Sequence, residues 1–286
     1  MTARKIDTIL PSRPTIEGAG VRLRRAFGPH EVPLLDPFLM LDDFHSENPA
    51  DYIAGFPWHP HRGIETVTYM INGIIDHGDS LGNKGTIGSG DVQWMTAGSG
   101  ILHQEMPRPY TGMMQGFQLW VNLPADNKMM EPRYRGIDSK QISSFSPTPG
   151  VDVKVIAGKV GDAEGPVQDL VVAAEYLDVE MKPGKEYKHK SHKRHKVFAY
   201  VFHGGAKFQN SQKHSSTAGH LVVLADGNEI DVKAGEDGAR FLLVSGEPIG
   251  EPVAWRGPIV MNTEQELDIA FQEYWSGRFI KSAAKQ

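Results

Sequence analysis

Two pairs of potential metal ligands constrain this chain more than any other feature of its sequence. His59 and His61 lie two residues apart, and so do His103 and Glu105 further along the chain. On a β-strand, side chains two residues apart point to the same face, so each pair presents its ligands in one direction. Turn signals between the pairs, such as Asn72-Gly73, allow the chain to fold back. The spacing therefore predicts three imidazoles and one carboxylate around one point.

A second glutamate competes for the carboxylate position. Glu65 lies four residues after His61, so on an unbroken strand it shares the ligand face. Val67 and Tyr69 would continue that face inward as an apolar row. Parity alone therefore leaves Glu65 and Glu105 as alternatives, and both can lie near the ion.

The ligand types restrict the metal. The chain has no cysteine, which argues against a closed thiolate zinc site. Neutral imidazoles with a carboxylate suit Fe(II), Mn, Co, Ni, Cu or Zn. Four protein ligands around an ion that accepts about six leave positions open for water, dioxygen or substrate. The pattern therefore favours a catalytic metal over a structural one.

Composition and charge exclude several classes of protein. The 31 glycines and 19 prolines are scattered, as expected for many short strands joined by turns. The formal net charge of -5 argues against general nucleic-acid binding. We find no signal region at the N-terminus and no apolar run of membrane-spanning length. The sequence predicts a cytoplasmic all-β protein without a membrane partner.

Several segments resemble the cupin metal-binding pattern and, in detail, the pirin family. They are DPFLMLDDF, HPHRGIETVTYM, GDVQWMTAGSGILHQEMP and the late WRGPIVMNTEQEL. The resemblance spans nearly the whole chain and implies His59, His61, His103 and Glu105 as the metal ligands. It implies that Glu65 lies next to the ligands without binding the metal. In ordinary cupins, by contrast, the glutamate after the first histidine pair is the ligand.

The resemblance also implies a bicupin, which is two double-stranded β-helix (jelly-roll) barrels in one chain. A stretch rich in proline, serine and charge after Pro124 predicts a domain boundary near residue 140, and short β-type runs resume beyond it. We expect a metal-binding N-terminal cupin domain at residues 1–140 and a C-terminal cupin domain without metal at residues 141–286.

Three histidines in the second half do not favour another metal site. His189, His192 and His195 lie in a basic run, and like charge disfavours a divalent cation. Strand parity also turns His192 away from the other two. We therefore interpret the run as a surface loop or a contact for an anionic partner.

One helix is predicted near the C-terminus. Thr263 and Glu266 have the spacing of a capping box, and Gly277 marks the helix end. The helix carries one apolar stripe and is expected to brace a barrel, with the stripe formed by Leu267, Ala270, Phe271 and Tyr274.

Other residues are placed by weaker signals. The strand with Arg22, Arg24 and Arg25 is expected to have a solvated basic face, and His77 is expected in an exposed loop. Asp42 and Asp43 either reach the metal site or cap a turn, and the turn is the favoured interpretation. Aromatic and sulfur side chains near the ligands form either core or the wall of a pocket for a flat ligand, and they are Phe56, Trp58, Trp94, Met95 and Met106.

Two functions are consistent with this site. A redox-active metal can bind a deprotonated enolic oxygen and make the substrate reactive toward dioxygen, while Glu105 acts as the catalytic proton acceptor. The pirin resemblance implies a quercetin 2,3-dioxygenase type of enzyme, with Fe(II) as the leading metal and a small aromatic flavonol and O2 as substrates. The alternative that it implies is an iron-binding, redox-sensing transcriptional co-regulator that acts through a protein partner without turnover.

Overall fold

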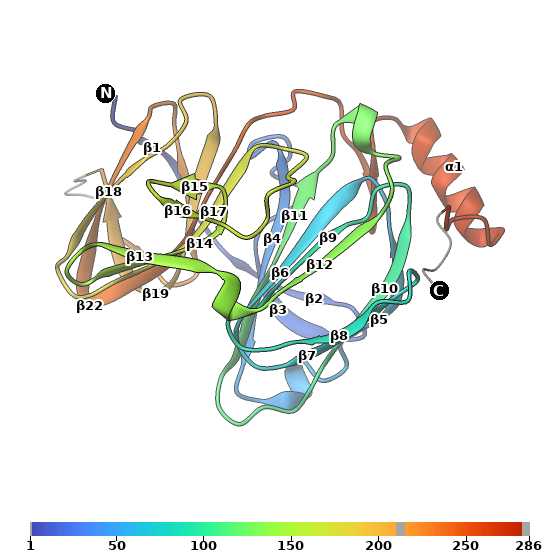
Figure 1. Ribbon diagram of the computed structural model, residues 1–286, viewed down its shortest axis with the longest axis horizontal. Helices are drawn as coiled ribbons and strands as arrows, with labels where there is room; N and C mark the ends of the chain where they lie inside the picture. Colours follow the sequence, from blue (N-terminus) through green and yellow to red (C-terminus); the bar gives the residue numbers. More distant parts are fainter. Residues whose placement is uncertain (1, 210–214, 282–286) are drawn as a thin grey trace. The chain divides into compact units, whose positions relative to one another are not determined.

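The computed structural model describes residues 2–209 and 215–281 and confirms the all-β, two-barrel fold (Figure 1). The chain forms two compact units. The first, which we call the histidine barrel, contains residues 14–33 and 38–139 and the chain from Ile249 onward. The second barrel contains residues 34–37 and 140–248 and the chain up to Arg13. The domain division at residue 140 stays a prediction, and the compact units differ from it because each terminal segment joins the barrel that lies further away in sequence.

The larger sheet of the histidine barrel has three nine-residue strands near its centre, and most of their side chains are buried on both faces. The strands follow the order β12-β9-β6-β11-β4-β3-β2 among the described residues. Their bounds are β12 Arg133–Ile137, β9 Val92–Thr96, β6 Ile64–Asn72, β11 Met114–Asn122, β4 Phe38–Ser46, β3 Val21–Phe27 and β2 Arg13–Glu17.

A smaller sheet of the same barrel carries the histidines. It has the order β5-β10-β7-β8, with bounds β5 Phe56–His61, β10 Ile101–Pro107, β7 Ile75–Asp79 and β8 Lys84–Ile87. Alternate residues of β10 are fully buried, including His103 and Glu105. This two-residue period is what the sequence predicted, because one face of the strand looks into the barrel.

The second barrel repeats the antiparallel pattern around a valine-rich core. Its main path runs β1-β21-β19-β22-β17-β14-β13, with β18 on β22 and β20 on β19. The bounds are β1 Ile6–Pro11, β21 His220–Leu224, β19 Lys196–Phe208, β22 Glu229–Gly246, β17 Ala174–Met181, β14 Val151–Ala157, β13 Ser143–Thr148, β18 Glu186–Lys190 and β20 Ser216–Thr217. A short pair, β15 Lys159–Val160 and β16 Ala163–Glu164, completes it.

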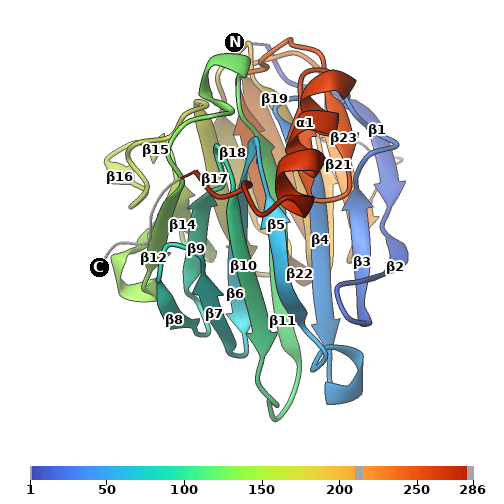
Figure 2. The same cartoon turned by 90° about the vertical axis from the view of Figure 1, so that its right-hand side faces the viewer.

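The C-terminal segment returns to the histidine barrel. It forms the hairpin β23 Ala254–Arg256 and β24 Ile259–Met261 and then the helix α1 Glu264–Trp275, which lies beside β23 in Figure 2. The capping box is confirmed, since Thr263 accepts a hydrogen bond from the Glu266 amide and the Glu266 side chain accepts one from the Thr263 amide. The predicted stripe packs on the hairpin and on Leu102 of β10, so the helix braces the strand that carries His103.

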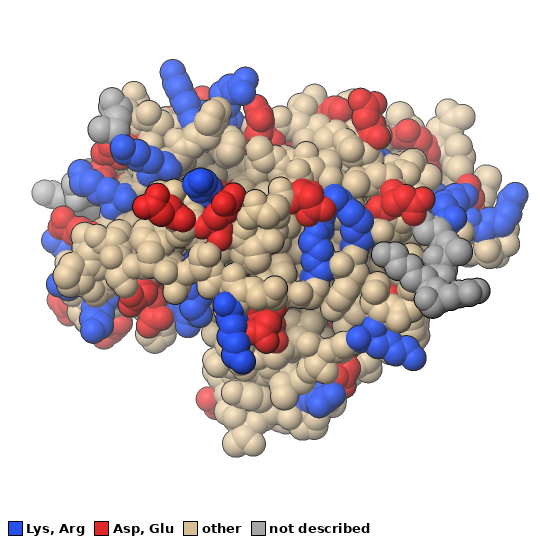
Figure 3. Space-filling view, viewed as in Figure 1, with Lys and Arg blue, Asp and Glu red and all other residues tan. Residues whose placement is uncertain are grey.

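The face of the molecule in Figure 3 carries both signs of charge. On the face in Figure 3, lysine and arginine side chains are interspersed with aspartate and glutamate. Within the described residues, no helix has both the length and the apolar character that crossing a membrane requires.

Candidate metal centre

Three imidazoles converge inside the histidine barrel. His59 of β5 is the register partner of His103 on β10, and His61 follows on the same face of β5. The ring centroid of His103 lies 4.3 Å from that of His59 and 5.0 Å from that of His61. One ring nitrogen from each of the three lies within 4.8 Å of the others. The structure thus brings together all three predicted histidines.

The hydrogen bonds of these rings leave lone pairs aimed at one point. The Nδ1 atoms of His59 and His61 lie 2.8 Å and 3.0 Å from the carbonyl oxygens of Pro57 and Pro258. A carbonyl only accepts, so both Nδ1 atoms carry the proton and both Nε2 atoms carry a lone pair. The two Nε2 atoms nevertheless face each other at 3.1 Å. Two facing lone pairs repel unless a proton or a metal ion lies between them.

His103 supplies a second test of fit for a metal. Its side chain is fully buried, and within the described residues neither ring nitrogen has a hydrogen-bond partner. A buried polar atom without a partner costs about 1–3 kcal/mol, so such an atom calls for an explanation. A metal ion bound by one ring nitrogen provides it for that nitrogen.

The protonation states agree with metal binding. Burial lowers the pKa of His59, although the Pro57 carbonyl and Glu105 oppose this shift. Burial and the neighbouring imidazoles lower the pKa values of His61 and His103 well below the usual histidine range. All three rings are therefore neutral at physiological pH, which is the form that binds metals.

Glu105 lies next to this group and is held by three side chains. The Thr68 hydroxyl donates to its Oε1 atom at 2.7 Å, the Gln118 amide donates to Oε2 at 3.0 Å, and the Gln93 amide donates to Oε1 at 3.3 Å. The carboxylate is buried and close enough to raise the pKa of His59. Its oxygens are not among the ligand atoms that lie within 4.8 Å of one another, which are ring nitrogens of the three histidines. The role of Glu105 as a ligand therefore stays a proposal.

The expectation that Glu65 shares the ligand face is wrong. The strand is broken between β5 and β6 at Gly63, whose φ is 78° and whose missing Cβ would lie 1.9 Å from the Val260 carbonyl oxygen. Only glycine fits there. Glu65 therefore starts a different strand and accepts a hydrogen bond from the Thr96 hydroxyl at 2.5 Å. It lies on the opposite face of β6 from Thr68, which contacts Glu105.

The expectation of an exposed His77 is also wrong. His77 lies inside β7 and is only 4% exposed. Its ring stacks on Tyr134 with centroids 4.7 Å apart and lies 5.6 Å from the ring of His103. Its Nε2 atom is 3.5 Å from Asp79. Glycines on both sides suggested a loop, whereas the register partner of His77 is Glu105, so it lies beside the ligand strand.

A pocket of about 660 Å³ is lined by His59 and His61. Of the five side chains expected as core or pocket wall, Phe56 and Trp58 line the pocket, whereas Trp94 and Met95 are core residues. Met106 is half-buried on β10 and is not among the residues that line the pocket. Trp58 is half exposed, and Trp120 and Trp255 form another wall with ring centroids 5.7 Å apart. A pocket of this size and apolar character suits a flat organic ligand.

The polar part of the pocket wall contradicts two sequence-based interpretations. The Arg22 side chain is 71% exposed, as expected for a solvated face, whereas Arg25 makes two bonds of 2.8 Å and 2.7 Å to the Asp42 carboxylate and lines the pocket. Asp42 does not cap a turn but lies within β4, nearly fully buried. Asp43 points elsewhere and contacts the His45 ring at 2.8 Å.

The C-terminal segment fixes the ligand strand in place. Arg62, next to His61, is only 2% exposed and donates to the carbonyl oxygens of Ser99 and Phe279. Its guanidinium also pairs with Glu273 of α1 at 2.8 Å. The bond from His61 to the Pro258 carbonyl joins residues 197 positions apart, and the bond from Arg62 to the Phe279 carbonyl joins residues 217 positions apart. Local sequence patterns carry no signal for such contacts.

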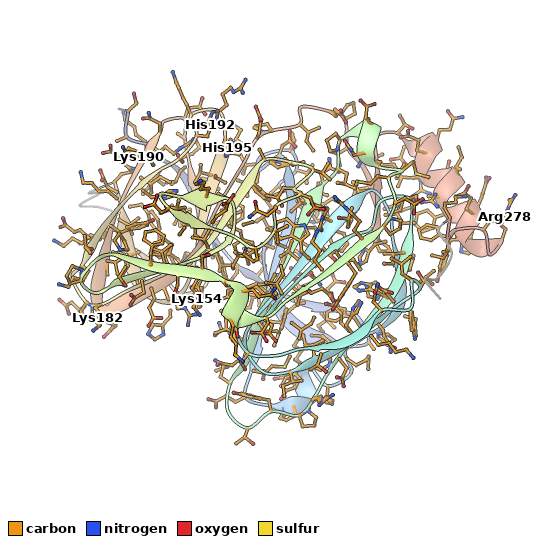
Figure 4. All side chains as sticks on the ribbon, viewed as in Figure 1. Lys154, Lys182, Lys190, His192, His195 and Arg278 are labelled. Carbon is orange, nitrogen blue, oxygen red and sulfur yellow. The ribbon has the colours of Figure 1, made fainter. Side chains whose placement is uncertain are left out.

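The basic run of the second barrel is only partly a surface loop. His189 lies in β18, where alternate residues are buried, and its Nε2 atom is 2.6 Å from Glu175. The turn that follows places the His192 and His195 rings 4.9 Å apart, because strand parity does not apply there. Figure 4 shows these two rings near Lys190 at one edge of the second barrel. Contact with an anionic partner stays a prediction.

Two jelly-roll barrels, one with converging histidines beneath a pocket, define a bicupin with a candidate metal centre. The family model for pirin matches residues 20–121, and the model for the pirin C-terminal cupin domain matches residues 176–280. The chain therefore belongs to the pirin family, as the sequence motifs indicated.

Individual relatives agree with this assignment. The chain is 42% identical to a Pseudomonas aeruginosa protein named "Putative quercetin 2,3-dioxygenase", over 96% of this chain and 97% of the relative. It is 43% identical to a "Pirin-like protein" of Caulobacter vibrioides, over 98% and 100%. A crystal structure of quercetin 2,3-dioxygenase from Acinetobacter baumannii matches with a TM-score of 0.90 and 32% identity, covering 97% of this chain and 98% of that one.

Proposed function

We propose that this protein is a metal-dependent dioxygenase that cleaves quercetin or a similar flavonol with O2. The observation that carries the proposal is the convergence of three neutral imidazoles, one of them without a hydrogen-bond partner in the described structure, beneath an aromatic-walled pocket that His59 and His61 line. Two similar proteins, from P. aeruginosa and A. baumannii, carry names of this activity and support it.

The donor set fits one metal ion, which His59, His61 and His103 would hold with Glu105 as the fourth ligand. When bound, a redox-active ion supplies the Lewis-acid and electron-transfer chemistry that an enolic substrate needs to react with O2. We propose Fe(II), with Mn, Co, Ni, Cu or Zn as the other ions that suit imidazoles and a carboxylate.

The protein's own groups bind the substrate and move its proton. Trp58, Trp120 and Trp255 offer flat surfaces for an aromatic ligand and exclude water from the pocket floor. The Glu105 carboxylate borders the pocket and accepts the proton that an enolic hydroxyl releases. The Thr68 and Gln118 donors fix its orientation for this transfer.

A redox-sensing co-regulator that acts through a protein partner is the second candidate. It rests on the family and on the same ligands, because a metal whose oxidation state changes can alter the charge beside the pocket. This role predicts a partner that binds one oxidation state only and no turnover. The cytoplasmic location and the absence of nucleic-acid binding stay predictions.

Anaerobic loading of the metal-free protein with each candidate ion, followed by addition of quercetin and O2, tests the first function. We expect O2 consumption and loss of the flavonol absorption band for at least one ion, and no reaction for His61→Ala. His192→Ala, an exposed histidine of the second barrel, is the matched control and should keep full activity. Binding of flavonol without turnover by every metal form would contradict the enzyme function.

A further inference from the structure

The pocket wall contains a second charged group that the metal chemistry does not use. Arg25 of β3 binds both oxygens of Asp42 on β4, and its Nη2 atom also lies 2.9 Å from a Glu17 oxygen. All three residues line the same pocket as His59 and His61. The Asp42 side chain is 4% exposed and that of Arg25 is 16% exposed. A buried ion pair in a pocket wall is expensive to desolvate, so its position calls for a reason.

Strand register places this group at a defined position relative to the histidines. Asp42 is the register partner of Arg25 on one side and of Gln118 on the other. Gln118 is in turn the partner of Thr68. Directly opposed residues share a face, so these four side chains form one polar row across the pocket floor. Gln118 and Thr68 hold Glu105, and Asp42 lies about one strand spacing, about 5 Å, beyond Gln118.

The charges of the group determine what it can bind. Two carboxylates share one guanidinium, so the group has a surplus of negative charge when both are ionised. Each oxygen of Asp42 accepts one bond from Arg25 and keeps a second lone pair. Burial, opposed by the bonds from Arg25, raises the pKa of Asp42 to about 6, so its charge is incompletely compensated. Such a group gains from a further hydrogen-bond donor and repels an anion.

The side chains around Asp42 favour a hydrogen-bond donor that is attached to a flat apolar group. Met40 and Phe44 flank Asp42 on the same face of β4, and Trp120 lies next to Gln118 on β11. An aromatic ring fits between such side chains, and a hydroxyl group on it can reach the Asp42 and Glu17 oxygens.

We propose that Arg25, Asp42 and Glu17 form a subsite that accepts phenolic hydroxyl groups on the end of the substrate that lies away from the histidines. This inference rests on the proposed flavonol substrate, and it specifies a preference for flavonols with a hydroxylated pendant ring. Asp42 and Glu17 accept the hydrogen bonds, and Arg25 orients both carboxylates.

Kaempferol and galangin test the subsite, because they differ by a single hydroxyl on the pendant ring and neither pendant ring can chelate a metal. Binding is measured anaerobically by quenching of the tryptophan fluorescence that the pocket provides. We expect wild-type protein to bind kaempferol about tenfold more tightly than galangin, as one hydrogen bond to a charged acceptor implies. The preference should persist in metal-free protein, because the subsite contains no metal ligand.

Variants separate recognition from folding. Asp42→Asn should reduce the preference to below about twofold, and Glu17→Gln, a more exposed side chain, to about threefold. Asp178→Asn is the matched control, because Arg240 binds Asp178 through two bonds of 3.0 Å and 2.7 Å in the second barrel. It should leave the preference at the wild-type value.

Equal affinity of wild-type protein for both flavonols would overturn the subsite, and so would an unchanged preference in the folded Asp42→Asn and Glu17→Gln proteins. If Asp42→Asn does not fold, the Glu17→Gln result decides. The preference in binding is independent of turnover, so a protein that prefers kaempferol but never consumes O2 would refute the dioxygenase and keep the subsite. Turnover without a preference for kaempferol would support the dioxygenase and refute the subsite.

Discussion

Each barrel has a histidine on a strand at the edge of a sheet, but only the strand of the histidine barrel lies beside ring nitrogens that have no partner in the described structure. In β5, His59 faces His103 across the sheet, and the nitrogens of His103 have no partner in the described structure. In β18, His189 faces Ile230. Both nitrogens of His189 are in use, since Nδ1 lies 3.1 Å from the Tyr187 hydroxyl and Nε2 lies 2.6 Å from Glu175.

This difference shows that the presence of histidine does not define the site. A ring whose two nitrogens are both satisfied inside the protein gains little from a metal and loses hydrogen bonds on binding one. Rings with one nitrogen fixed by a backbone carbonyl and the other left free are oriented for a metal. In the second barrel, His189 instead joins Tyr187 and Glu175 through hydrogen bonds.

The largest expected effect is on metal content. His103→Ala should reduce metal affinity by at least about 100-fold, because it removes one of three converging ligands. His189→Ala should leave metal content unchanged but reduce the free energy of unfolding by about 2 kcal/mol, since it leaves a cavity and an unpaired Glu175. Metal analysis and urea denaturation of both variants measure the contrast. Loss of metal from His189→Ala would break the comparison.

Each barrel also has a buried arginine that ties a terminal segment to it, and the two should differ in effect. Arg62→Ala should cost about 3 kcal/mol of unfolding free energy and weaken metal binding about tenfold, because it releases α1 from the strand of His61. Arg4 is fully buried and donates to the Ser191 hydroxyl and the His192 and His195 carbonyls. Arg4→Ala should cost a similar free energy with metal affinity unchanged.

Calorimetric titration of each metal-free variant with the metal that supports turnover, beside chemical denaturation, distinguishes these two arginines. An equal loss of metal affinity in both variants would show that the terminal segments do not act on separate barrels.

A smaller effect concerns pH and the Arg25–Asp42 pair. The pKa of Asp42 is about 6 in the folded protein against an ordinary value of 3.8, mainly because the side chain is buried. The folded state therefore holds this proton more tightly, so the contribution of Asp42 to stability is largest below pH 4 and is lost as pH rises to about 6. Two pKa units correspond to about 3 kcal/mol.

The measurement is urea denaturation of wild-type and Asp42→Asn proteins at pH 4 and pH 7. The stability of Asp42→Asn relative to wild type should increase by up to about 3 kcal/mol between these values. A constant difference across this range would show that Arg25 fully compensates the buried charge.

The smallest predicted effect is at the pocket mouth. Trp58 is 50% exposed although it is a large aromatic residue, and it lies one residue before His59. Trp58→Ala should raise KM for a flavonol about fivefold with kcat and metal content nearly unchanged, because it removes stacking surface that substrate and transition state use equally. Steady-state kinetics check this, and a change in kcat alone would place Trp58 in the reaction itself.

The sequence predicted what depends on local periodicity. The two-residue period placed His103 and Glu105 on one face, and the capping box at Thr263 located the helix. It failed where the period is interrupted, since Gly63 is a glycine within a strand-like pattern and does not by itself show that one strand ends there and Glu65 turns away. His77 was misplaced because glycines around β7 suggested a loop.

Contacts between distant segments could not be predicted at all. The pairing of Arg25 with Asp42 requires β3 and β4 to be neighbours in a known register. His61 and Pro258 are 197 residues apart, and most of the second barrel lies between them in sequence. Their contact depends on the chain returning to the histidine barrel after that segment. Such contacts follow from topology, which the pattern of single strands does not encode.

The Pro258 carbonyl on His61 and the Glu273 carboxylate on Arg62 have a consequence for biosynthesis. A nascent chain emerges from the ribosome from its N-terminus. The histidine barrel therefore lacks its contacts with Pro258 and Glu273 until nearly all of the polypeptide has been translated. The ion-binding geometry is thus completed only in a finished molecule, and a prematurely terminated product would lack the means to hold its ligands in place.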